Sequence, residues 1–143
     1  MAAFSLVHQL HGFITSMFSD GLLDGQFQIL QSLQDSSAPH FVRETITLFC
    51  DDGERIIREL AKLLEKPSVD FERVDAFVHQ LKGSSSSVGA QRVKNTCLQF
   101  IEFCREKNRA GCMRTLRSLR NEFYDVRAKF QTMLQLVQLV QAK

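Results

Sequence analysis

The stretch His79-Gln-Leu-Lys-Gly-Ser-Ser-Ser-Ser-Val-Gly89 completes a helical pattern of apolar residues while filling the opposite side with small ones. From Phe71 to Val88, apolar residues recur as in an amphipathic helix that packs one face into a core. They are Phe71, Val74, Phe77, Val78, Leu81 and Val88. At about 100° per residue most of them share one face, and His79 lies about 160° from its middle. The pattern therefore predicts a helix that directs the His79 imidazole into solvent.

The residues beside His79 on this helix are mostly small. The positions three, four and seven residues further on are Lys82, Gly83 and Ser86, and Ser84 and Ser87 lie next to them. We call Gly83, Ser84, Ser86 and Ser87 the small-residue patch. A glycine inside a helix costs about 1 kcal/mol relative to alanine, and each serine adds a smaller cost. Because folding alone does not favour these residues, the patch indicates that the backbone of another protein comes close to His79.

A flexible linker is the alternative interpretation of residues 83–87, with the helix ending at Lys82. Two observations favour a continuous helix. Val88 returns in phase with Leu81, and Gly89 is better placed than Gly83 to end the helix.

An exposed histidine in such surroundings suits one kind of chemistry. A histidine side chain has a pKa of about 6.5 in water, so its neutral ring is a nucleophile that can accept a phosphoryl group. The cation of Lys82 can stabilise the added charge. No Ser/His/Asp set is visible, and no carboxylate is expected to be aimed at the ring, since only Glu72 and Asp75 precede it on the same face. The sequence thus predicts a carrier that depends on its partners for catalysis.

The segment from His79 to Ala90 resembles the signature of the histidine-containing phosphotransfer (HPt) family, and the longer match resembles its plant members. The resemblance extends over nearly the whole chain. The other stretches that carry it are Gly21-Leu-Leu-Asp-Gly-Gln-Phe27, Phe41-Val-Arg-Glu-Thr45, Leu48-Phe-Cys-Asp-Asp52, Val69-Asp-Phe71, Val74-Asp-Ala76, Arg92-Val-Lys-Asn95, Asn108-Arg109 and Asn121-Glu-Phe-Tyr124.

The resemblance implies a role for each residue of the motif. His79 is the expected phosphorylated residue, Lys82 its charge partner, and Gly83 the opening for an incoming receiver domain. The serines at positions 84, 86 and 87 are expected to support the phosphoryl group or the partner. Some plant relatives lack the histidine, whereas this chain keeps it.

The function implied by the resemblance is that of a phosphorelay mediator. His79 accepts a phosphoryl group from the receiver-domain aspartate of a sensor histidine kinase and passes it to response regulators, in cytokinin signalling, in the cytoplasm and the nucleus. The chain is then a carrier rather than an enzyme, with no cofactor or metal of its own, because the Mg²⁺ of the transfer belongs to the receiver. The alternative is a non-catalytic helical adaptor that docks receiver domains.

The composition limits the other classes of function. The chain has 143 residues, of which 44% are hydrophobic and 24% charged, as expected for one soluble domain. Residues 1–88 carry 7 Lys/Arg against 12 Asp/Glu, and residues 89–143 carry 11 against 4. The basic residues of the second half lie among helical apolar positions without interleaved exposed aromatics, which favours a solvated face over a nucleic-acid surface. No stretch predicts a signal peptide or a membrane span, and we expect a monomer.

The cysteines and the other histidines fit structural roles. Cys50, Cys97, Cys104 and Cys112 lack CxxC spacing, so reduced thiols in the core are expected rather than disulfides or zinc ligands. His8 and His11 have a spacing that could bind a metal, but no further ligands gather around them. His40 is expected to be a bystander.

The remaining helices follow from periodicity and helix-end signals. A first helix is predicted over residues 3–19, and a second from Asp24 through Leu33. A third starts near Pro39 and runs through Leu48 and Leu63 to Pro67, with Gly53 loosening its middle. Ser68 or Asp70 can cap the helix that carries His79. A fifth follows Ala90 and stops near residues 108–111, and a sixth covers about residues 112–138.

These helices predict an all-α fold within a single domain over residues 1–143. Four long amphipathic helices with short connections form an antiparallel bundle over about residues 38–140. Two additional N-terminal helices, over about residues 3–34, pack at one end or side of the bundle and are candidates for a lid. Twelve phenylalanines and no tryptophan indicate a phenylalanine-rich core.

Overall fold

A computed structural model describes residues 2–142 of the chain, with the side chains of residues 5–142. This part forms six α-helices, and its only β pairing consists of two isolated bridges. The all-α prediction is therefore confirmed. The helices are α1 (Ala2–Ser19), α2 (Gly25–Ser32), α3 (Phe41–Glu65), α4 (Phe71–Val88), α5 (Gln91–Arg105) and α6 (Arg109–Gln141).

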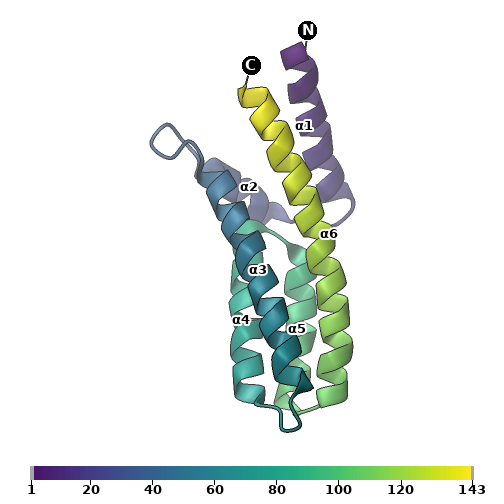
Figure 1. The fold of residues 1–143 in the computed structure, drawn as a ribbon. Coiled ribbons are helices and arrows are strands. Elements are labelled where there is room, and N and C mark those ends of the chain that lie inside the picture. The colour runs from purple at the N-terminus through teal and green to yellow at the C-terminus, as the bar shows by residue number, and fades with distance from the viewer. Residues whose placement is uncertain (1, 143) are drawn as a thin grey trace.

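The four C-terminal helices form an antiparallel bundle in which α4 packs against α3 and α5, and α6 packs against the same two helices (Figure 1). Aromatic rings fill its centre. The ring of Phe49 in α3 lies 5.6 Å from that of Phe123 and 6.0 Å from that of Phe130, both in α6. Phe100 of α5 is also fully buried. The phenylalanine-rich core is thus confirmed.

The two N-terminal helices pack at one end of the bundle, as predicted. Figure 1 shows α1 beside the C-terminal part of α6, which it contacts, while α2 lies against α4. Lys129 of α6 places its ammonium 5.6 Å from the centre of the Phe13 ring in α1. Phe27 of α2 is fully buried and stacks 6.1 Å from Phe130, so α2 shares the core of the bundle.

Three details of α2 and α3 differ from the sequence predictions. Leu33 and Leu48 were expected on apolar faces, but they are 57% and 61% exposed. Leu33 follows the end of α2, and in α3 the buried side chain is the neighbouring Phe49. Gly53 does not loosen α3, which is continuous; a Cβ atom at this position would overlap the ring of Phe123. Gly53 therefore allows α3 and α6 to pack closely.

The connection between α5 and α6 also differs from the prediction. Helix α5 ends at Arg105, and Lys107 adopts a positive φ of 53°, which turns the chain before residue 108. Helix α6 begins at Arg109 rather than near Cys112, because the side chain of Asn108 accepts a hydrogen bond of 2.9 Å from the backbone N–H of Gly111.

All four cysteines are buried and free, which confirms the prediction of core thiols. Burial raises the pKa of the Cys97 thiol to about 12 and that of the Cys50 thiol to about 11. The sulfur atoms of Cys104 and Cys112 lie 4.0 Å apart. In the described part of the chain, no helix combines the length and hydropathy needed to cross a bilayer.

Candidate functional site

Helix α4 is defined by a cap at each end. The side chain of Asp70 accepts a hydrogen bond of 3.2 Å from the backbone N–H of Arg73 and so caps the N-terminus. At the C-terminus, Gly89 adopts the left-handed conformation with φ of 77°. A Cβ atom at Gly89 would lie 2.6 Å from the backbone nitrogen of Phe27, so α2 approaches α4 here. Helix α4 is continuous through residues 83–87, which excludes the linker interpretation.

The serines after Gly83 are accommodated within the helix. The hydroxyl of Ser84 donates to the carbonyl of Leu81 at 3.1 Å, and that of Ser87 donates to the carbonyl of Gly83 at 3.1 Å. Ser84 and Ser86 are half-buried, and Ser87 is exposed. Ser85 faces the core instead, where its hydroxyl donates to the carbonyl of Leu81 at 2.7 Å. The small-residue patch therefore presents short side chains beside His79.

His79 directs its side chain to solvent, as predicted, with 47% of that side chain exposed. The expectation that no carboxylate is aimed at the ring is wrong. Nε2 of His79 lies 3.3 Å from Oδ2 of Asp75. The reason is the spacing of four residues, which places the two side chains next to each other on consecutive turns. Sequence reasoning noted Asp75 on this face, and the same spacing was the signal that it contacts the ring.

Lys82 is half-buried on α4. Its ammonium counteracts the effect of burial by lowering the pKa of the Cys97 thiol in α5. Within the described side chains, no ion pair joins Lys82 to a carboxylate. The cation one turn after His79 is therefore not neutralised by a close acidic group, and it can attract an anion at this face.

Gly83 lies in open space. It is exposed, and a Cβ atom built at this position would meet no atom within 4 Å outside its own helix backbone and neighbours. The packing of this protein therefore does not require a glycine at position 83. The surface around His79 combines an accessible nucleophile, a cation and free space, which is what an incoming phosphoryl donor needs.

The structure leaves the other candidate residues apart from this site. His11 and His40 are exposed, and His8 is exposed on α1. Among the residues that the structure describes, no three His, Cys, Asp or Glu side chains gather as metal ligands. The basic side chains of the α5–α6 region, at positions 105, 107, 109, 114, 117 and 120, are exposed, as expected for a solvated face.

Comparisons with known proteins agree with this geometry. The family model of the Hpt domain matches residues 44–129. The chain is 66% identical to histidine-containing phosphotransfer protein 1 of rice over 99% of this chain and 97% of that protein. An X-ray structure of a rice histidine-containing phosphotransfer protein superposes with a TM-score of 0.94 at 61% identity, covering 99% of both chains. The crystal structure of a maize protein of the same name has a TM-score of 0.91 at 62% identity, covering 94% of this chain and 99% of that one.

The open surroundings of Gly83 predict that Gly83→Ala stabilises the protein. Alanine is favoured over glycine inside a helix by about 1 kcal/mol, and its methyl group meets no obstacle. Thermal unfolding should show a melting temperature about 3 °C higher. The matched control is Gly53→Ala, whose methyl group overlaps Phe123 and should lower the melting temperature. A destabilised Gly83→Ala protein would contradict the described surroundings of Gly83.

Proposed function

Because the chain belongs to the Hpt domain family and is a phosphotransfer mediator of two-component phosphorelays, we propose that His79 is the residue that carries the phosphoryl group. The observation that supports this assignment is the position of His79. Its ring is half-exposed on α4, one turn before the open space at Gly83 and the unpaired cation of Lys82. His79 accepts the group from the receiver-domain aspartate of a sensor histidine kinase and passes it to the aspartate of a response regulator.

The transfer is a displacement at phosphorus. The lone pair of an imidazole nitrogen of His79 attacks the phosphorus of the aspartyl phosphate, the phosphorus–oxygen bond to the aspartate breaks, and the receiver regains a free carboxylate. In the second half of the relay, the carboxylate of the response regulator attacks the same phosphorus and the nitrogen–phosphorus bond breaks. Each step conserves the phosphoryl group, so the chain acts as a carrier and consumes no further reactant.

The residues around His79 bind the phosphoryl group and leave room for the receiver domain, and they do not activate the His79 ring as a nucleophile. Lys82 offsets the charge of the bound phosphoryl group, while the small-residue patch leaves room for the surface of the receiver domain. This chain contributes no metal ligand to the reaction, and the Mg²⁺ of the transfer is held by the receiver. The chain therefore depends on its partners for catalysis.

The proposed cellular setting is supported by the plant origin of the relatives. The chain works as a monomer in cytokinin signalling, and it carries the signal from receptors reached in the cytoplasm to response regulators in the nucleus. A protein of 16.4 kDa is small enough to move between the two compartments.

Replacing the nucleophile is the direct test of His79. Incubation with a receiver domain phosphorylated on its aspartate should label the wild-type protein with a bond that survives alkali and is lost in acid. His79→Gln should lose the label, because its amide nitrogen is not a nucleophile at neutral pH. His40→Gln is the matched control, since His40 is exposed on a different element, and it should be labelled normally. Receiver binding without labelling of the wild-type protein would instead support the non-catalytic adaptor.

Bulk at Gly83 should block transfer without preventing folding. Gly83→Phe places a ring in open space, so the fold should be retained, but the ring holds the receiver away from His79. The initial rate of labelling should fall at least about tenfold, since small displacements of reacting atoms are costly. Gly83→Ala, with one methyl group, should transfer at nearly the wild-type rate. If Gly83→Phe transfers as fast as Gly83→Ala, the open space at Gly83 is not used by the partner.

The carboxylate of Asp75 should oppose the charge of the phosphoryl group, because it lies 3.3 Å from Nε2 of His79. Asp75→Asn removes this repulsion and should shift the equilibrium toward phosphorylated His79 by about two- to threefold, as expected for exposed charges. The ratio of phosphohistidine to aspartyl phosphate at equilibrium measures this shift. Glu72→Gln, one turn further from the ring, is the control. An unchanged or lower ratio in Asp75→Asn would show that Asp75 does not act on the bound group.

A further inference from the structure

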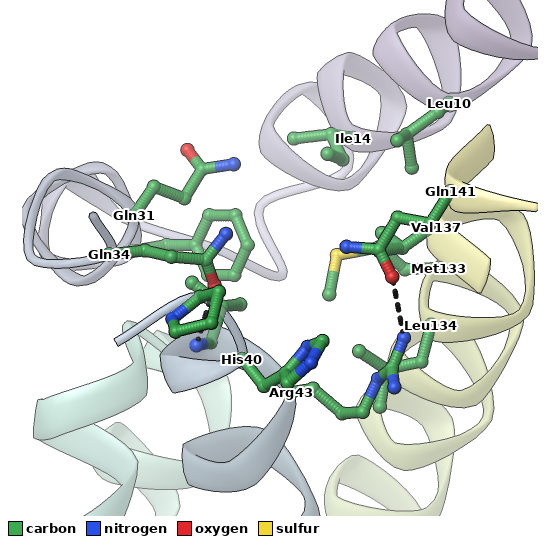
Figure 2. Close-up of a pocket in the computed structure, with 13 residues that line it drawn as sticks. Leu10, Ile14, Gln31, Gln34, His40, Arg43, Met133, Leu134, Val137 and Gln141 are labelled. Carbon is green, nitrogen blue, oxygen red and sulfur yellow. Dashed lines mark hydrogen bonds between the residues drawn. The ribbon is translucent and has the colours of Figure 1, made fainter. Parts of the chain in front are cut away.

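A pocket apart from the His79 site lies where the N-terminal helices meet the bundle. This cavity has a volume of about 150 Å³. It lies between α1, α2, the beginning of α3 and the C-terminal part of α6, and Figure 2 shows the residues that line it. Residues from these four helices and from the connection before α3 line it, and none of them belongs to the His79 site. The cavity therefore requires an explanation apart from phosphoryl transfer.

The inner wall of the cavity is apolar. Phe27 of α2 and Met133 of α6 are buried, and Leu10, Ile14 and Val137 complete the wall from α1 and α6 (Figure 2). A cavity of similar volume lined by leucine, isoleucine and phenylalanine in another protein remains dry and accepts benzene. The part of a ligand that fits this wall is therefore an apolar group of about the size of one six-membered ring.

The rim of the cavity offers hydrogen-bond donors. Oε1 of Gln34 accepts a hydrogen bond of 3.0 Å from the backbone N–H of Val42. Oε1 of Gln141 accepts one of 2.9 Å from the guanidinium of Arg43 (Figure 2). Since both amide oxygens are occupied, the two glutamines present their NH₂ groups as donors. A ligand at this rim must supply the acceptors.

The rim also carries a positive charge, which favours an anionic group on the ligand. Arg43 is the one permanently charged side chain among the described residues that line the cavity, and no aspartate or glutamate is among them. Within residues 5–142 its guanidinium donates to the neutral amide of Gln141, and no ion pair joins Arg43 to a carboxylate there. A planar guanidinium binds a carboxylate through two parallel hydrogen bonds, which is a stronger arrangement than a single bond to an amide.

We propose that this cavity binds a small carboxylic acid with an apolar ring, such that the ring contacts Phe27 and Met133 and the carboxylate binds Arg43. The size of the wall selects the ring, and the donors and the positive charge of the rim select the anion. The proposal does not depend on His79, so it can fail or succeed separately from the assignment of phosphoryl transfer.

The test is a titration of the full chain with benzoate, followed by NMR of ¹³C-labelled methionine methyl groups. The methyl signal of Met133 should shift and saturate with a dissociation constant of about 1 mM or tighter. Met113 is 46% exposed near the opposite end of α6 and is an internal control whose signal should not change. Benzamide, which has the ring without the charge, and acetate, which has the charge without the ring, should both bind at least about tenfold more weakly.

Two variants locate the binding site. Arg43→Gln should weaken benzoate binding about tenfold or more, while Arg55→Gln, on an exposed position of the same helix, should leave it unchanged. Val137→Phe should abolish binding by filling the cavity, and a cooperative thermal unfolding transition close to that of the wild-type protein is the check that its fold is retained. No saturable shift of Met133, or equal binding by Arg43→Gln and the wild-type protein, would overturn the proposal. Tighter binding of neutral N-acetylphenylalanine amide than of benzoate would also overturn it, by assigning the cavity to a partner's side chain.

Discussion

The burial of one face of α4 against α3 and α5 is the constraint on which the rest of this structure depends. Val74, Val78 and Leu81 are completely inaccessible on that face. Because the helix has a fixed period, their burial leaves His79 no orientation other than outward. A change in the phase of this one helix would bury the imidazole, and the surface proposed to receive a phosphoryl group would disappear. The core therefore determines where the nucleophile lies, although it does not touch it.

The face around His79 is one that folding alone would not select. Gly83 is surrounded by open space, so its lack of a side chain lowers helix stability without relieving any contact. Gly53 is the opposite case, because its lack of a side chain lets Phe123 pack against α3. Glycine thus stabilises the interface between α3 and α6 at position 53, whereas at position 83 it lowers the stability of α4. The extensive apolar core offsets the cost at Gly83, which leaves position 83 free to serve a partner.

The N-terminal helices pack against the C-terminal end of α4, the helix that carries His79. The backbone N–H of Asp24 donates to the carbonyl of Gly89 at 3.0 Å, and Phe27 packs against the same glycine. Phe27 also stacks on Phe130 and forms part of the wall of the cavity beside α1. Phe27 of α2 therefore contacts the C-terminal end of α4, packs in the core and lines the cavity. Helices α1 and α2 are consequently part of the packed structure at this end of the bundle.

The local features of this protein could be predicted from its sequence, because they depend on neighbours within a few residues. Periodicity predicted α4 and the exposure of His79, and Asp70 and Gly89 were recognisable as its two ends. The contact between Asp75 and His79 was also within reach of the sequence, since a spacing of four residues determines it. The tertiary structure decided the features that join distant segments. Gly53 meets Phe123 across 70 positions, and the cavity combines residues from both ends of the chain. Helical period fixes what one helix presents, but only the packing of the helices against one another determines which of those surfaces meet.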